Sequence, residues 1–312
     1  MESQKPKIAM YVKRPFGEKL NASFDFIKEN WKQLFKYSTY LILPICFIQA
    51  ANFNGLMGSM TDLTAMQTAG QIGGDPMAAF GVSFMLNYAG VVLFSCLGAL
   101  LLTSLIYALV RMYNEREERL NGIVFKDIKS LLLHNIKRLF LMGIVCSFLC
   151  FFAVIIVILL AVLTPFTLIL TIPLLFAFMI PLALMAPIYL FEDISLGEAF
   201  AKTFRLGFAT WGGVFLVLIV MGIIAGVLQT IVSIPWYVIY IVKMVFTMSD
   251  GGATSSSVGL NFTQYLFSIL MLYGSYLSAI FSIVGLVYQY GHASEVVDSI
   301  TVESDIDNFD KL

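Results

Sequence analysis

The sequence predicts an all-α, polytopic membrane protein with about six transmembrane helices. Three observations predict this class: the low content of charge, the long apolar segments, and the positions of Lys and Arg. Of the 312 residues, 59% are hydrophobic and 12% are charged, and the mean hydropathy is +0.86. Soluble domains carry roughly 25% charged residues. A chain this poor in charge cannot cover a water-facing surface, so most of its surface is expected to face lipid.

Six apolar segments follow one another along the chain. Each has close to the ~20 residues that a helix needs to cross ~30 Å of hydrocarbon. The segments are 37–56, 87–110, 139–163, 165–190, 213–234 and 264–288.

Nearly all of the 19 Lys and Arg residues lie on one predicted side of the membrane. They precede the first segment, or they lie between the second and third segments or between the fourth and fifth. The positive-inside rule makes this side cytoplasmic, so both termini are predicted to be cytoplasmic.

One amphipathic stretch occurs twice, at an offset of 180 residues. The first copy is GEKLNASFDFIKENW, from Gly17 to Trp31, and the second is GEAFAKTFRLGFATW, from Gly197 to Trp211. In the first copy one helical face is apolar, and Lys19 belongs to the charged face opposite. This period, with basic residues and Trp at the apolar edge, is typical of a helix that lies in the membrane interface.

A third amphipathic stretch, Val124 to Phe140, precedes the third apolar segment. Its identity to the other two is poor, so whether the middle unit is a true repeat stays open. We expect three units, each an interfacial helix followed by a transmembrane hairpin. They would form one integral membrane domain, with an acidic cytoplasmic tail after it. The expected ranges are 12–110, 120–190 and 194–290 for the units, 1–290 for the domain and 291–312 for the tail.

Two pairs of acidic residues are predicted to lie at helix ends: Glu18 and Glu198 in the repeated stretch, and the adjacent Glu192 and Asp193. Ser195 and Glu198 have the spacing of a capping box. Glu18 has Pro15 at the corresponding capping position, so a contact shared by Glu18 and Glu198 is an open alternative. Glu192 and Asp193 end the fourth apolar segment, and they are predicted to act either as caps or as salt-bridge partners of Arg205 or nearby Lys residues.

The repeated pattern, a Gly-Glu pair followed by Ser or Thr, Phe, Trp and a span, resembles a known membrane domain. This domain is found in some glycerophosphoryl diester phosphodiesterases and in related bacterial membrane proteins of the Bacteroidetes type. The similarity covers most of the chain and rests on short hydrophobic motifs. It implies this fold and a location in the bacterial inner membrane, and it implies no activity.

No constellation typical of catalysis is found in the sequence. Ionisable residues are absent from the central parts of the six apolar segments, where they would indicate function. His134 and His292 are expected to be solvated, and the cysteines fall inside apolar segments. We therefore expect no enzyme activity, no catalytic residue, no cofactor, no metal site and no nucleic-acid partner.

The fourth apolar segment contains several prolines, among them Pro173 and Pro181. A proline inside a helix removes a hydrogen bond and bends the axis. Broken helices line substrate sites in transporters, whereas a kinked packing helix is the plainer interpretation. Both alternatives stay open on the sequence alone.

The leading hypothesis from the sequence is a non-enzymatic inner-membrane protein that scaffolds or regulates a membrane complex. The alternative is a transporter or channel for a neutral or lipid-like solute. The expected partners are membrane lipids and either other membrane-protein subunits or further copies of the chain. The residues singled out for structural or functional roles are Gly17, Glu18, Trp31, Pro173, Pro181, Glu192, Asp193, Gly197, Glu198 and Trp211.

Overall fold

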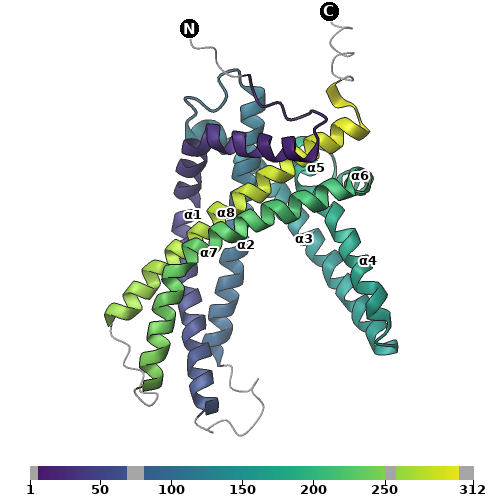
Figure 1. Ribbon diagram of the computed structural model, residues 1–312. Helices are drawn as coiled ribbons and strands as arrows, with labels where there is room; N and C mark the ends of the chain where they lie inside the picture. The colour runs from purple at the N-terminus through teal and green to yellow at the C-terminus, as the bar shows by residue number, and fades with distance from the viewer. Residues whose placement is uncertain (1–5, 69–80, 250–257, 302–312) are drawn as a thin grey trace, which may run out of the picture. The chain divides into compact units, whose positions relative to one another are not determined.

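The computed structural model describes residues 6–68, 81–249 and 258–301. These residues form the α-helices α1 to α8 and contain no β-strand. Six helical segments are long and apolar enough to cross a membrane. The predicted class is therefore confirmed, and the chain is an all-α, multi-pass membrane protein (Figure 1).

The helices follow the predicted order, with one break in the fourth span. They are α1 (Phe16–Thr68), α2 (Val82–Glu115), α3 (Phe125–Leu163), α4 (Thr167–Leu182), α5 (Met185–Phe191), α6 (Leu196–Ala209), α7 (Trp211–Ser249) and α8 (Val258–Val297). The break falls at Ala183 and Leu184, directly after Pro181. Pro187 lies four residues past Ala183, and a proline cannot donate a hydrogen bond to the carbonyl four residues before it, so this position for the break fits the sequence.

The chain divides into two compact units. Unit 1 contains 1–34, 103–223 and 280–312, and unit 2 contains 35–102 and 224–279. Helices α1, α2, α7 and α8 therefore contribute to both units, whereas α3, α4, α5 and α6 belong to unit 1 alone. These units are assembled from distant parts of the chain, and they do not coincide with the three consecutive units expected from the sequence.

The three amphipathic stretches begin in the same helical register. Their first helical residues are Phe16, Phe125 and Leu196, and an acidic residue stands third in each helix: Glu18, Asp127 and Glu198. The first and third stretches also contain the same kind of internal hydrogen bond at equivalent positions. The Ser23 hydroxyl donates to the Lys19 carbonyl, and the Thr203 hydroxyl donates to the Ala199 carbonyl. A common origin of the units stays a prediction, to which these shared positions add support.

The buried face of α1 differs from the predicted one at Lys19. The sequence placed Lys19 on the charged face, but its side chain is buried and its ammonium group donates to Oε1 of Gln289 at 2.8 Å. The buried positions include Lys19, Ser23, Phe26 and Leu34, while the predicted apolar residue Trp31 is exposed. Periodicity located the stripe, but it could not distinguish the protein-facing side from the side left open to lipid.

Helices α3 and α4 form a hairpin (Figure 1), and many of its apolar side chains are exposed. Only the first part of α3 has buried residues, namely Ile128, Leu132, Asn135 and Leu139. Val124, the first residue of the third amphipathic stretch, is exposed. Past Leu139 the side chains of α3 are exposed or half-buried, as those of α4 are as far as Met179. Lipid or another membrane protein must cover such a surface.

Unit 2 contains polar side chains between its helices. Gln49 is buried, and its side chain donates to the Ser95 hydroxyl and accepts from the Tyr276 hydroxyl. Asn54 donates to the buried Ser268 hydroxyl at 2.8 Å. Such hydrogen bonds between helices satisfy polar groups where no water is present.

The start of the predicted tail is ordered. Helix α8 continues to Val297, and Ala293 and Glu295 are buried. Asp298 lies next to Lys202 and Arg205 of α6, at 2.8 Å from each. The expectation of a separate tail after residue 290 is therefore corrected for 291–301, because this segment belongs to unit 1 and contacts α6. The rest of the predicted tail lies outside the described residues.

Candidate functional site

The connector between α5 and α6 begins with two adjacent acidic residues that enter different networks. Glu192 ends α5, and Asp193 follows with a φ of 50°. This is the left-handed region, which non-glycine residues rarely adopt and which Asp tolerates better than most. The two carboxylates are bound by different groups of basic residues.

Asp193 is bound by basic side chains from α2 and α3. One carboxylate oxygen lies 2.9 Å from the Arg111 guanidinium. The other lies 3.1 Å from Nε2 of His134 and 3.8 Å from the Arg138 guanidinium. Burial raises the pKa of the Asp193 carboxyl, but hydrogen bonds from Arg111 and His134 and the charges of Arg111 and Arg138 outweigh it, so the pKa is below its ordinary value.

Arg138 fixes the connector to α3 by several contacts. Its guanidinium donates to the carbonyl oxygens of Tyr189 and Ile194, both at 2.6 Å. It also lies over the Tyr189 ring, 3.9 Å from the ring centroid. With a side chain only 17% exposed, Arg138 is a positioning residue for the chain on both sides of Asp193.

Glu192 belongs to a second network that joins α5, α6 and α8. Its carboxylate accepts a hydrogen bond from the Tyr290 hydroxyl at 2.8 Å and pairs with Lys202 at 2.7 Å. Lys202 also pairs with Asp298, which in turn pairs with Arg205. Burial lowers the pKa of the Lys202 ammonium, but the bonds to Asp298 and Glu192 outweigh this, so its pKa is above the ordinary value.

These contacts resolve the alternatives for the predicted acidic residues. Glu192 and Asp193 both form salt bridges, with Lys202 and Arg111 as their closest basic partners. Arg205, named as a candidate partner, pairs with Asp298. His134 is exposed, as predicted, and its Nε2 also lies 3.1 Å from a carboxylate oxygen of Asp193.

His292, also expected to be solvated, is half-buried, and its ring nitrogen Nδ1 accepts from the Arg14 backbone N–H. Lys202, the partner of Glu192, is one of the nearby Lys residues that the sequence named. Sequence reasoning missed Arg111, His134 and Arg138 as partners of Asp193. The i, i+4 spacing of His134 and Arg138 was the one available signal that two of them share a helical face.

Glu18 and Glu198, which hold equivalent positions in the two copies of the repeated stretch, have different environments. Glu198 completes the capping box with Ser195, whose backbone N–H donates to the Glu198 carboxylate at 3.0 Å. Glu18 is exposed in the first turn of α1, where its charge acts on Arg14. The capping prediction for Glu198 is confirmed, and no contact common to both acids exists among the described residues.

The paired glycines and tryptophans also differ from expectation. A Cβ atom on Gly17 or Gly197 would meet no atom within 4 Å, so crowding does not explain either glycine. Trp211 donates from its indole to the Ala177 carbonyl at 3.0 Å, which joins α7 to α4. Trp31 is 55% exposed. One tryptophan is thus a packing residue, and the other is free to meet the membrane interface.

Pro173 and Pro181 of the fourth span have different surroundings. Pro173 is exposed on α4. Pro181 is buried against α6, where a Cβ atom added to Gly207 would lie 2.5 Å from the Pro181 Cβ. Only glycine at position 207 allows this close approach. Pro181 therefore lies in a contact between α4 and α6.

An open hollow of about 510 Å³ lies beside Asp193 in unit 1, and we call it the α2–α3 hollow. The end of α2, the beginning of α3 and the α5–α6 connector surround it. Its polar lining comes from Arg111, Glu115, Arg116, Asp127, Ser130, His134 and Asp193. Basic and acidic groups are present in similar number, so the hollow can meet both signs of charge.

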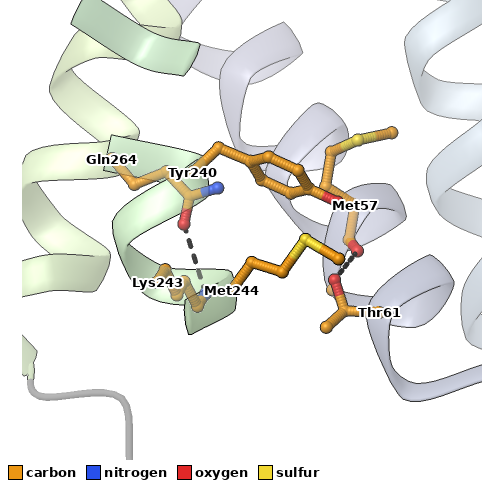
Figure 2. Close-up of a pocket in the computed structure, with 7 residues that line it drawn as sticks. Met57, Thr61, Tyr240, Lys243, Met244 and Gln264 are labelled. Carbon is orange, nitrogen blue, oxygen red and sulfur yellow. Dashed lines mark hydrogen bonds between the residues drawn. The ribbon is translucent and has the colours of Figure 1, made fainter. Parts of the chain in front are cut away.

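A second, much smaller cavity lies in unit 2 between α1, α7 and α8. Figure 2 shows Tyr240 and Met244 extending from α7 toward Met57 and Thr61 of α1. Lys243 donates to Oε1 of Gln264 at 3.2 Å at the same place. The cavity measures about 20 Å³, which is room for about one water molecule.

Among the described residues, no group of three or more His, Cys, Asp or Glu side chains is placed to hold a metal ion. No known protein family, curated protein or solved structure matches the chain. The resemblance to the phosphodiesterase membrane domain therefore stays a prediction.

Proposed function

We propose that the protein is a non-enzymatic integral protein of a bacterial inner membrane, with cytoplasmic termini, that scaffolds or regulates a membrane complex. One observation carries this proposal. The amphipathic beginnings of α1 and α3, together with α6, belong to one compact unit. Ion pairs join their surroundings, including Arg119 to Glu29 at 2.6 Å and Arg111 to Asp193. A fixed polar platform of this kind suits the binding of another protein.

This polar surface, formed by the beginnings of α1 and α3 and by α6, has basic side chains that a partner could bind. Lys126, Lys129 and Lys137 on α3 are exposed and form no ion pair with another described residue. The apolar hairpin of α3 and α4 continues from the same helix. A partner with an acidic cytoplasmic segment and a transmembrane helix would match both surfaces, since charge would orient it and apolar contact would hold it.

Transport of a neutral or lipid-like solute is the second candidate function. The polar side chains inside unit 2, with Lys243 beside Gln264, favour it. The cavity there is too small for a solute, and Pro181 packs against α6 instead of lining a path. Uptake of solutes by liposomes that contain the purified protein would test this alternative, and a protein-dependent flux would support it.

Site-directed photo-crosslinking in native membranes tests the proposal. A photoreactive amino acid would replace Lys129 on α3 and, as the matched control, Val82 at the opposite end of α2, which is also exposed. We expect position 129 to give one crosslinked protein band and position 82 to give none of that mass. Crosslinks to lipid alone at position 129 would contradict the proposal.

A further inference from the structure

The α2–α3 hollow has unused hydrogen-bond donors. The guanidinium of Arg116 lies 3.7 Å from Glu118 and 3.8 Å from Asp127, both beyond hydrogen-bond length. The hydroxyl of Ser130 has no hydrogen-bond partner among the described residues. A guanidinium and a hydroxyl that line the same hollow are donors suited to phosphate oxygens.

The same hollow has unused acceptors. One oxygen of Glu115 accepts from Arg111 at 2.9 Å, and the other is unused among the described residues. One oxygen of Asp127 accepts from the Val124 N–H at 3.0 Å, which likewise leaves its second oxygen. An ammonium group, which has three donors and no acceptor, suits such carboxylate oxygens.

Neither sign of charge fits the hollow by itself. An anion alone would face the carboxylates of Glu115 and Asp127, and a cation alone would face Arg116. A ligand that carries a phosphate and an ammonium a few bonds apart satisfies both sets without adding net charge. We propose that the α2–α3 hollow binds a zwitterionic phosphoethanolamine headgroup, with its phosphate at Arg116 and Ser130 and its ammonium at Glu115 and Asp127.

The position of the hollow along the chain favours a membrane lipid as the source of this headgroup. Arg111 directly follows the second predicted span, His134 shortly precedes the third, and Asp193 follows the fourth. The hollow therefore belongs to the polar boundary of the membrane. Leu133, adjacent to His134 in the sequence, and Phe140, further along α3, are both exposed, and Phe140 is 60% exposed. These side chains offer apolar surface to acyl chains.

The test measures lipid binding by the full chain in detergent, with native mass spectrometry. The probes are short-chain phosphatidylethanolamine, short-chain phosphatidylglycerol and free phosphoethanolamine. We expect phosphatidylethanolamine to bind preferentially, and Arg116→Ala to weaken it about tenfold through the loss of a charge-assisted hydrogen bond. Glu115→Gln should weaken phosphatidylethanolamine but not phosphatidylglycerol, because only the former presents an ammonium.

The matched control is Lys32→Ala, which removes an exposed charge from α1, outside the hollow. It should leave binding unchanged. Thermal unfolding of Arg116→Ala should stay close to that of the unmodified protein, because the carboxylates nearest to the guanidinium lie 3.7 and 3.8 Å away, beyond hydrogen-bond length. Ser130→Ala provides a second variant, with a smaller expected loss of affinity.

Three results would overturn the proposal. Equal binding of both lipids, insensitive to Glu115→Gln, would reduce the hollow to a site for anions. Unchanged binding in Arg116→Ala would place the lipid elsewhere. Full competition by free phosphoethanolamine at the lipid's own concentration would overturn a lipid as the source. The site does not depend on the protein's being a subunit of a complex, so a lone chain could still bind the headgroup.

Discussion

Asp193 offers the sharpest test of how unit 1 is held together. Asn has the same shape as Asp and also tolerates the left-handed backbone conformation. Asp193→Asn therefore removes only the charge that faces Arg111, His134 and Arg138. Hydrogen bonds to charged groups contribute about 1.5–3 kcal/mol each when well buried. The Asp193 side chain is 41% exposed, so water replaces much of that contribution. We expect Asp193→Asn to lower the free energy of unfolding by about 1 kcal/mol.

The backbone at Asp193 supplies a second, independent prediction. At a φ of 50°, an alanine suffers a steric cost of about 1–2 kcal/mol that glycine avoids. Glycine, in turn, gains about 0.5–1 kcal/mol more conformational freedom in the unfolded chain. We therefore expect Asp193→Ala to be less stable than Asp193→Gly by about 0.5–1 kcal/mol.

Equilibrium unfolding in mixed micelles, followed by tryptophan fluorescence, measures both differences. The matched control is Glu18, which is exposed in the first turn of α1. There the order should reverse, with the Ala variant more stable than the Gly variant, because glycine has the lower helix propensity. An Ala variant at 193 as stable as the Gly variant would refute the left-handed backbone and the reasoning from it.

The depressed pKa of Asp193 also predicts a pH dependence. Because the folded-state pKa is below the unfolded value of about 3.9, the carboxylate stabilises the fold fully above that value. This contribution is lost as the pH falls below the unfolded value and through the folded-state pKa. The difference in stability between the unmodified protein and Asp193→Asn should therefore be present at neutral pH and shrink in acid. A difference that stayed constant would contradict the charged contacts.

Two further substitutions test helix contacts. Gly207→Ala should destabilise by about 1–3 kcal/mol, because the added Cβ would lie 2.7 Å from the Pro181 Cα. Gly197→Ala, in open space, should instead stabilise slightly in the same unfolding assay. Trp211→Phe removes a hydrogen bond and should cost about 1 kcal/mol, whereas Trp31→Phe should leave stability unchanged and only weaken association with lipid vesicles. Equal effects of the two tryptophan variants would contradict their different environments.

The sequence was sufficient for the membrane class, the six spans and the cap at Ser195 and Glu198. Each depends on local properties, namely apolar length and the spacing of a capping box. The same properties could not show that Lys19 is buried, because its partner Gln289 is 270 residues away along the chain. An amphipathic period identifies a stripe, but protein and lipid both accept apolar side chains.

The partners of the predicted acids were equally beyond local reasoning. Glu192 and Asp193 are neighbours, so no pattern could show that one joins α6 and α8 while the other joins α2 and α3. The left-handed backbone at Asp193 is what lets adjacent residues enter separate networks. The α2–α3 hollow likewise arises from three elements that meet only in the folded chain.

The proposal that this chain is a subunit of a membrane complex is tested most directly by the mass of the assembly that is isolated with it from native membranes. The chain would be released gently with mild detergent, purified by an affinity tag, and measured intact by mass spectrometry. A subunit should appear with a second protein in fixed proportion, above the 34.7 kDa of the chain itself. A particle with the mass of one chain, or of whole multiples of it, would contradict this account.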